Sequence, residues 1–146
     1  MLFLRINPIN INLKGINMKE QDLDNKVHLA RNFKGSEDKI FKNYSKELTP
    51  NMLKNLSTSI NFYTRRRVAQ HPKTSPEVLK TLGTDKVWVV REGVVCNPRT
   101  PNNVLIFIFE KEREQPHKDL ILALIKNKNL PEFVYQCIAS LWPELI

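Results

Sequence analysis

Apolar residues in the middle of the chain recur as short stripes that prolines separate. Val78, Leu79 and Leu82 stand at i, i+1 and i+4 behind Ser75-Pro76, a spacing that puts them on one face of a short helix. A serine or threonine hydroxyl caps a helix N-terminus, and proline is tolerated at the first helical position. We therefore predict a short helix beginning at Pro76, and a similar one beginning at the proline of Thr49-Pro50.

A second helix is predicted behind each of these, over residues 62–70 and 88–96. Pro72 and Pro98 follow them, and a residue that precedes proline is pushed out of the α region. Helices of about three turns are too short to be stable alone. Their apolar stripes must therefore be buried against neighbouring units.

The pattern repeats with a fixed period. Segment 49–56 returns as 75–82, and segment 65–72 returns as 91–98, both 26 positions later. Residues 123–127 match 93–97 at an offset of 30, which places four extra residues in the charged run 110–114. Residues 29–32 are a weaker copy of 68–71, displaced by 39. Periods of 20 to 50 residues are typical of solenoids, so we predict an all-α solenoid of stacked helical pairs.

Segment 68–79 (VAQHPKTSPEVL) and its copy 94–101 (VVCNPRTP) resemble the leucine-rich repeat variant family, a HEAT-like helical repeat. The resemblance covers about 48–142 and implies a short right-handed α-solenoid of paired α and 3₁₀ helices. One member of the family carries a cysteine-bound iron–sulfur cluster ahead of its repeats, but no such cysteine cluster is present here. The family has no single activity, so the resemblance implies no catalytic residue.

Three segments are predicted along the chain. Residues 1–18 are expected to form a poorly packed N-terminal tail, residues 19–47 a helical N-terminal cap, and residues 48–146 the helical-repeat domain. In the cap, Leu23, Val27 and Ala30 follow i, i+4, i+7, as a terminal unit with one apolar face requires. Pro8 and Arg5 interrupt the apolar start of the tail, which excludes a membrane span or secretion signal there and favours a cytoplasmic location.

Charge adds a candidate binding surface. The formal net charge is +8, from 23 basic and 15 acidic residues. Arg65 and Arg91 are equivalent in the repeat, as are Lys73 and Arg99, so basic side chains should form rows along the solenoid. The candidate binding residues are Arg65, Arg66, Arg67, Lys73, Arg91 and Arg99. Such rows can attract an acidic protein surface, track a nucleic-acid backbone, or simply be solvated.

Candidate chemistry is sparse. Cys96 and Cys137 are the only cysteines; we expect both to be buried reduced thiols, without a metal. His71, Asn97 and Asn127 share one repeat position and should bond local backbone. The run 110–114 should be solvated, and the aromatic rings of Tyr63 and Trp88 should pack between units.

The sequence holds no glycine-rich phosphate loop, nucleophile elbow or Cys-x-x-Cys. We therefore expect no enzyme, no cofactor, no small-molecule substrate and no membrane association. The prediction is a cytoplasmic binding or scaffold module that meets an acidic protein surface. Nucleic-acid binding through phosphate contacts of the Arg and Lys rows is the alternative.

Overall fold

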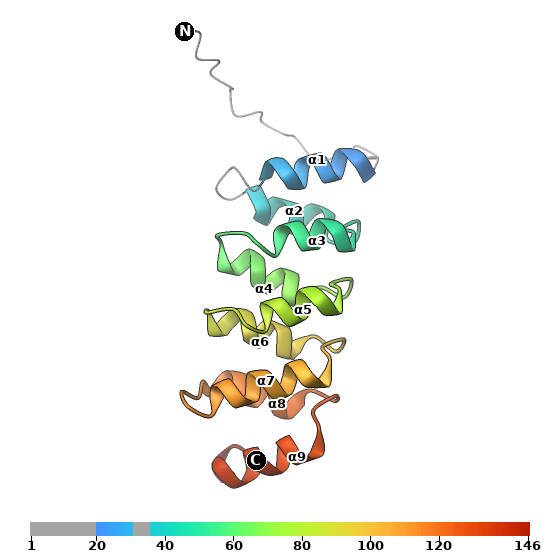
Figure 1. Cartoon of the computed structure of the whole chain (residues 1–146). Coiled ribbons are helices and arrows are strands. Elements are labelled where there is room, and N and C mark those ends of the chain that lie inside the picture. The colour runs from blue at the N-terminus through green and yellow to red at the C-terminus, as the bar shows by residue number, and fades with distance from the viewer. Residues whose placement is uncertain (1–19, 31–35) are drawn as a thin grey trace.

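The computed structural model describes residues 20–30 and 36–146, and every secondary-structure element in this part of the chain is a helix. Successive short helices stack like the rungs of a ladder from α1 to α9 (Figure 1). The all-α fold with helices of similar length confirms the prediction of a short helical repeat. The helices are α1 (Glu20–Ala30), α2 (Ser36–Tyr44), α3 (Pro50–Leu56), α4 (Phe62–Gln70), α5 (Pro76–Leu82), α6 (Trp88–Cys96), α7 (Asn102–Glu112), α8 (Lys118–Lys126), α9 (Glu132–Leu141) and the 3₁₀ helix η1 (Pro143–Leu145).

The predicted helix ends are confirmed where a hydroxyl caps a proline-led helix. Thr49 Oγ1 accepts a hydrogen bond from the Met52 N–H at 3.3 Å, and Ser75 Oγ accepts one from the Val78 N–H at 3.4 Å. Helices α4 and α6 have the predicted bounds and end two residues before a proline. Local sequence therefore sets the length of each helix.

Thr100 does not cap α7, although Thr100-Pro101 resembles the capped pairs Thr49-Pro50 and Ser75-Pro76. Pro101 is the residue that precedes α7, and the Thr100 hydroxyl instead donates to the Val94 carbonyl at 2.6 Å. Thr74, its repeat equivalent, donates in the same way to the Val68 carbonyl at 2.5 Å. In each unit this threonine therefore hydrogen-bonds the turn to the end of the helix before it, α4 for Thr74 and α6 for Thr100.

The four extra residues of the later unit lengthen a helix. Helix α5 has 7 residues and α7 has 11, so the insertion adds about one turn of α-helix. This added turn ends at Glu112, inside the charged run where the offset placed it. The insertion therefore lengthens the sequence offset to 30 but still lets α8 pack on α6.

The closest packing in the stack joins the later second helices, α4 on α6 and α6 on α8. Gly93 makes the first of these contacts possible. A Cβ at Gly93 would lie 3.1 Å from Arg66 Cγ and from the Arg66 carbonyl oxygen, and 3.2 Å from Ala69 Cβ. Two adjacent helices can approach so closely only where one of them lacks a side chain.

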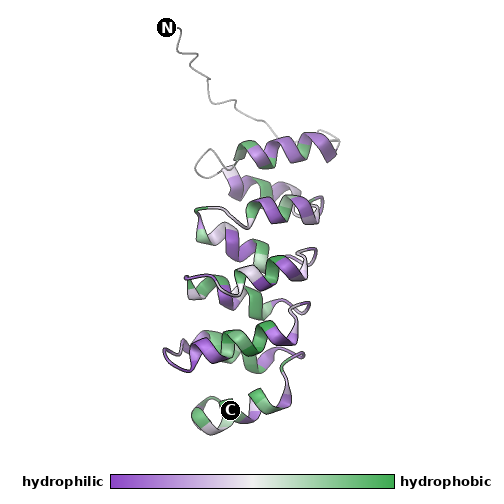
Figure 2. Ribbon diagram, in the orientation of Figure 1, coloured by the Kyte–Doolittle hydropathy of each residue, from purple (hydrophilic) through white to green (hydrophobic). Residues whose placement is uncertain are grey.

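The core runs along the stack as a line of apolar residues. Val68, Val94 and Leu124 occupy the same position of α4, α6 and α8, and all three are fully buried. Figure 2 shows hydrophobic and hydrophilic residues mixed on the helices of the stack. Each helix thus buries its stripe against its neighbours, which is the defining property of a solenoid.

The predicted N-terminal cap is described as two helices, α1 and α2, packed on α3 and α4. Leu23, Val27 and Ala30 are buried as predicted. The predicted tail, 1–18, lies outside the described residues.

Two details of the repeat expectation were wrong. Both helices of the pairs α3/α4, α5/α6 and α7/α8 are α-helices, and the 3₁₀ helix found in the described residues is η1, Pro143–Leu145. The weak copy at 29–32 was also misplaced. It was matched to the end of α4, the second helix of a pair, but Leu29 and Ala30 end α1. Helix α1 packs on α3, so it occupies the place of a first helix in its pair. Residues 31 and 32 are not described.

The position equivalent to His71 in the preceding unit is Ser45. The His71 ring bonds the Ser45 carbonyl as Asn97 bonds the His71 carbonyl, each across 26 residues. The regular period therefore reaches back to the end of α2. Sequence comparison missed this unit because α2 buries Phe41 and Tyr44, which have no similar residues in α4.

Candidate functional site

The repeat-equivalent pair Arg65 and Arg91 lies between units. Arg65 forms a two-point ion pair with Asp85, with Nε to Oδ2 at 2.7 Å and Nη2 to Oδ1 at 3.1 Å. Arg91 Nη2 lies 2.6 Å from Glu112 Oε1, and its side chain is only 10% exposed. Each arginine also donates to carbonyls of the loop before its own helix, those of Ser59 and of Asp85. These two cations hold successive units together and offer little charge to a partner.

Buried carboxylates accompany these arginines at the junctions between units. Glu37 of α2 accepts hydrogen bonds from the Ser59 and Thr64 hydroxyls, both at 2.7 Å. Glu112 accepts from Arg91 and, through Oε2, from the His117 backbone N–H at 2.9 Å. The sequence prediction missed both carboxylates as structural groups.

Glu112 overturns the expectation that the charged run is solvated. Its side chain is 1% exposed because the added turn of α7 carries it inward, beside Arg91. Burial acts to raise the pKa of Glu112, but hydrogen bonds from Arg91 and His117 outweigh burial and hold that pKa below its usual range. His117 also stacks on Trp88 with ring centroids 5.1 Å apart, and Trp88 packs on the core as predicted.

Lys73 and Arg99 form a row along the edge where the second helices end. Lys73 Nζ donates to the Lys46 carbonyl, and Arg99 Nη1 donates to the Pro72 carbonyl, both at 2.6 Å. Asn129 repeats the contact on the Pro98 carbonyl at 2.6 Å. Among the described residues neither cation has a carboxylate within ion-pair distance, so both remain exposed positive charges.

The position shared by His71, Asn97 and Asn127 bonds local backbone, as expected, and also bonds the preceding unit. Asn97 Oδ1 accepts from the Arg99 N–H, and Asn97 Nδ2 donates to the carbonyls of Ala69 and His71 at 2.8 and 3.1 Å. Asn127 Nδ2 donates to a carbonyl of α6 at 2.6 Å. The three residues are therefore a hydrogen-bonded ladder between units.

The His71 ring has no free nitrogen for catalysis or metal binding. Nδ1 accepts the Lys73 backbone N–H at 3.1 Å, so Nε2 carries the proton and donates to the Ser45 carbonyl at 2.7 Å. A general base needs an unoccupied lone pair. Within the described residues, no group of three or more His, Cys, Asp or Glu side chains could hold a metal ion.

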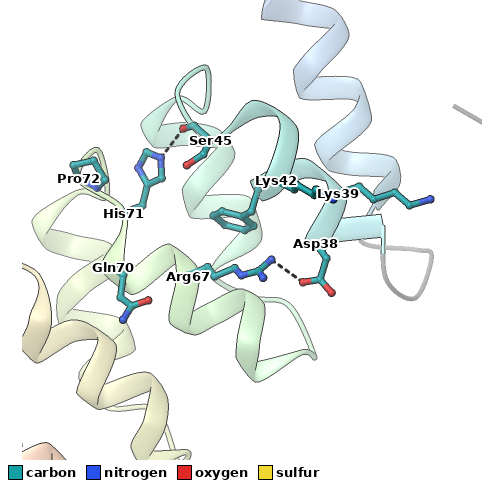
Figure 3. A pocket seen from close by; sticks show the side chains of 9 residues that line it. Asp38, Lys39, Lys42, Ser45, Arg67, Gln70, His71 and Pro72 are labelled. Carbon is teal, nitrogen blue, oxygen red and sulfur yellow. Dashed lines mark hydrogen bonds and ion pairs between the residues drawn. The ribbon is translucent and has the colours of Figure 1, made fainter. Parts of the chain in front are cut away.

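The outer surface of α2, α4, α6 and α8, which we call the second-helix face, holds two hollows. The basic hollow lies between α2 and α4 (Figure 3). Arg67 pairs there with Asp38 at 2.8 Å and places its guanidinium 5.9 Å from the centre of the Phe41 ring. Lys39 and Lys42 are exposed and belong to no ion pair of the described part. The lining residues are Asp38, Lys39, Phe41, Lys42, Ser45, Arg67, Gln70, His71 and Pro72.

The second hollow lies between α6 and α8 and is lined mostly by polar and charged side chains. Partly buried Leu122 and Ala123 and exposed Lys126 and Asp119 are among its lining residues. Between the two hollows, Arg66 and Glu92 pair at 2.9 Å across α4 and α6. The full lining is Glu92, Val95, Cys96, Pro98, Asp119, Leu122, Ala123, Lys126, Asn127, Lys128 and Asn129.

Both cysteines are exposed, so the prediction of buried thiols was wrong. Cys96 shares its repeat position with Gln70 and Lys126, which face solvent on α4 and α8. Partial burial of the sulfur and the nearby Glu92 carboxylate raise the pKa of Cys96 to about 11, so the thiol stays protonated at neutral pH. Tyr63 was also misjudged, because 58% of it is exposed on α4.

Sequence reasoning therefore found Arg66, Arg67, Lys73 and Arg99 as surface groups but missed Lys39 and Lys42 of the basic hollow. The signal for them was present: Lys39 and Lys42 stand at i and i+3 in a helix whose other face holds Ile40, Phe41 and Tyr44. In the described part of the chain, no helix is long and apolar enough to cross a membrane.

Comparisons of the chain with protein-family models, with curated proteins and with solved structures gave no match.

Proposed function

We propose that the chain is a non-catalytic binding module, of the leucine-rich repeat variant kind, that holds an acidic segment of a partner protein on its second-helix face. The basic hollow is the observation that supports this proposal. Three cations, Lys39, Lys42 and Arg67, surround it against the single carboxylate of Asp38. Two of the three have no ion-pair partner in the described part, so they can pair with an incoming carboxylate.

The basic residues proposed to bind the partner differ from those predicted from the sequence. Arg65 and Arg91 already pair with buried or half-buried carboxylates, and releasing them would break contacts between units. Lys73 and Arg99 stand at the edge beside the basic hollow and extend its positive potential. Exposed ion pairs contribute only about 0.2–1 kcal/mol each. Charge alone therefore gives orientation and a fast on-rate, and the affinity must come partly from apolar contacts.

Nucleic-acid binding is the second candidate, and the edge row of Lys73 and Arg99 favours it. These cations lie at equivalent positions of adjacent units without a carboxylate beside them. Two phosphate contacts would make log affinity fall with log salt concentration with a slope of about −1.8 on duplex DNA and about −1.4 on a single strand. This is a small electrostatic footprint compared with that of established DNA-binding proteins.

The test compares two charge-reversed proteins of equal net charge. Lys39→Glu/Lys42→Glu changes the basic hollow, and Lys54→Glu/Lys80→Glu changes exposed positions on α3 and α5, away from the second-helix face. Binding of a fluorescein-labelled oligoglutamate peptide and of a labelled single-stranded oligonucleotide is measured by anisotropy at low salt. We expect the peptide to bind wild type and the control but not the hollow variant. Equal loss in both variants would refute the proposal, and oligonucleotide binding without peptide binding would favour the alternative.

A further inference from the structure

The exposed surface of α3, α5, α7 and α9, which we call the first-helix face, changes in charge along the stack. Helices α3, α5 and α7 lie nearer the viewer than α4, α6 and α8 in Figure 1. One position of the repeat holds exposed lysines in the earlier units, Lys54 in α3 and Lys80 in α5. The same position holds Ile106 in α7 and Gln136 in α9. The later part of the first-helix face has therefore lost these cations.

Large apolar side chains replace polar ones on the same part of this face. The position of Thr81 in α5 holds Phe107 in α7, and the position of Glu77 in α5 holds Phe133 in α9. Phe107 is 43% exposed and Phe133 is 58% exposed. Leu141 is 47% exposed and lies eight residues after Phe133, on the same side of α9. Apolar surface that is covered in a solenoid core is here left open to solvent.

Four exposed residues of α7 and α9 form what we call the apolar patch: Phe107, Phe133, Cys137 and Leu141. Exposed and uncharged polar residues, Gln136 and Ser140, accompany the patch on α9, whose one charged residue is Glu132. On α7, Lys111 lies over the Phe107 ring with Nζ 5.7 Å from its centre. Aromatic residues at the centre and few charges are typical of a protein–protein interface.

The charge distribution along the chain indicates which protein suits the patch. Residues 1–99 contain 18 basic and 9 acidic residues, a net charge of +9, whereas residues 100–146 contain 5 basic and 6 acidic residues, a net charge of −1. Two copies of the chain repel each other through their basic parts. An antiparallel two-fold contact centred on α7 and α9 joins the nearly neutral parts and directs the basic parts to opposite ends of a dimer.

The size of the patch indicates how strong such a contact is. An aromatic side chain has roughly 200 Å² of surface, so the exposed fractions of Phe107 and Phe133 together give roughly 200 Å² per copy. Interfaces that bury less than about 1,200 Å² in total are weak and transient. A contact through this patch should therefore form and dissociate reversibly as the protein concentration changes.

We infer that the chain forms a weak two-fold dimer in solution through the apolar patch. Helices α7 and α9 of one copy pack on the same helices of the other, and Phe107, Phe133 and Leu141 lose their exposure. The inference does not depend on the proposed function, because the second-helix face stays free in such a dimer. Two basic hollows on one dimer would increase the avidity for a partner with two acidic segments.

Sedimentation velocity of the full chain measures its average mass over about a hundredfold range of protein concentration. The test variant is Phe107→Thr/Phe133→Glu, which introduces the residues that α5 carries at these positions, so the fold is expected to tolerate it. The matched control is Tyr63→Glu, because Tyr63 of α4 is also 58% exposed and the change in charge is the same as at Phe133. Circular dichroism confirms that each variant is folded.

We expect wild type and the control to approach twice the monomer mass as concentration rises, and the test variant to dimerise at least about tenfold more weakly. Added salt should leave the dimer intact or strengthen it, because screening weakens the repulsion between the basic parts. A wild type that stays monomeric, a test variant that dimerises as strongly, dissociation by salt, or a mass that grows beyond the dimer would each overturn the inference.

Cys137 gives a second readout, because it is exposed within the patch. In a Cys96→Ser background, a short bis-maleimide reagent should join two copies through Cys137, and Phe107→Thr/Phe133→Glu should suppress this product. Absence of the product without the patch substitutions, or an equal yield with them, would contradict the dimer. Wild type that stays monomeric but sediments with phosphatidylcholine vesicles would also overturn it and assign the patch to a lipid surface.

Discussion

Replacing Arg91 with methionine isolates the buried charge pair between units. The guanidinium is 10% exposed, binds Glu112 at 2.6 Å and donates to the Asp85 carbonyl at 2.9 Å. Its removal leaves Glu112 buried with only the two donors of His117. Breaking one side of a buried pair costs about 3–5 kcal/mol, which is a large part of the roughly 5–15 kcal/mol that stabilises a domain.

The dependence on pH distinguishes this loss from a general packing defect. In the wild type the pKa of Glu112 is lowered, so the pair stabilises the fold above the ordinary glutamate pKa, and this stability is lost as pH falls through the lower folded value. Without Arg91, burial should raise that pKa, since the largest opposing hydrogen bond is gone. The deficit of Arg91→Met should therefore be greatest near pH 7 and should shrink as the carboxyl becomes protonated.

Urea unfolding followed by helical circular dichroism measures the effect at pH 7 and at about pH 4, near the ordinary glutamate value. Arg99→Met is the matched control, because Arg99 is exposed and makes one hydrogen bond to a carbonyl; it should cost about 1 kcal/mol or less. The double variant Arg91→Met/Glu112→Leu should recover part of the loss, since no unpaired charge remains. A cost below about 1 kcal/mol for Arg91→Met, or a double variant no more stable than the single one, would refute the reasoning.

Three further predictions concern single positions. Gly93→Val should destabilise the fold by about 1–3 kcal/mol in urea titrations, because its side chain would push α6 away from α4; a neutral effect would contradict the close packing. Asn97→Ala should cost about 1–3 kcal/mol and exposed Asn129→Ala less, since it removes two buried hydrogen bonds, to the Ala69 carbonyl and to the His71 carbonyl, which keeps the Thr74 N–H as a donor; equal costs would count against the ladder. Cys96 should react slowly with iodoacetamide until pH approaches its raised pKa of about 11, and Glu92→Gln should speed the reaction; fast reaction of wild type at pH 7 would contradict this.

Most of the fold could be predicted because its determinants are local. Caps at Thr49 and Ser75 and prolines at 72 and 98 set the helix bounds within a few residues of sequence. The copy ending at Ser45 was missed because the buried positions of α2 (Glu37, Ile40, Phe41 and Tyr44) do not coincide at the offset of 26 with those of α4 (Thr64, Val68 and Ala69). The hydrogen bond at the helix end keeps the period, and it uses a backbone carbonyl that requires no particular residue type.

The candidate site was harder to predict because charge by itself does not say whether a side chain is free. Arg65, Arg67 and Arg91 look alike in sequence, yet Arg91 lies inside a junction and Arg67 is 46% exposed at the rim of a hollow. Where each arginine lies and how it is paired depends on a carboxylate 20 to 29 residues away: Asp85 for Arg65, Asp38 for Arg67 and Glu112 for Arg91. Repeat equivalence therefore identified residues in the same position but not the partners that neutralise them.

The sequence by itself determined the period, the short proline-bounded helices and the need to stack, because each of these follows from backbone restrictions and from apolar spacing within one unit. Only the tertiary structure decided which cations remain available. Stacking brings an acidic residue of one unit against a basic residue of another, buries Glu112 beside Arg91, and leaves Lys39 and Lys42 exposed at the basic hollow. The physical reason is that the free energy of a charge depends on its burial and its neighbours, and in a solenoid those neighbours belong to the next unit.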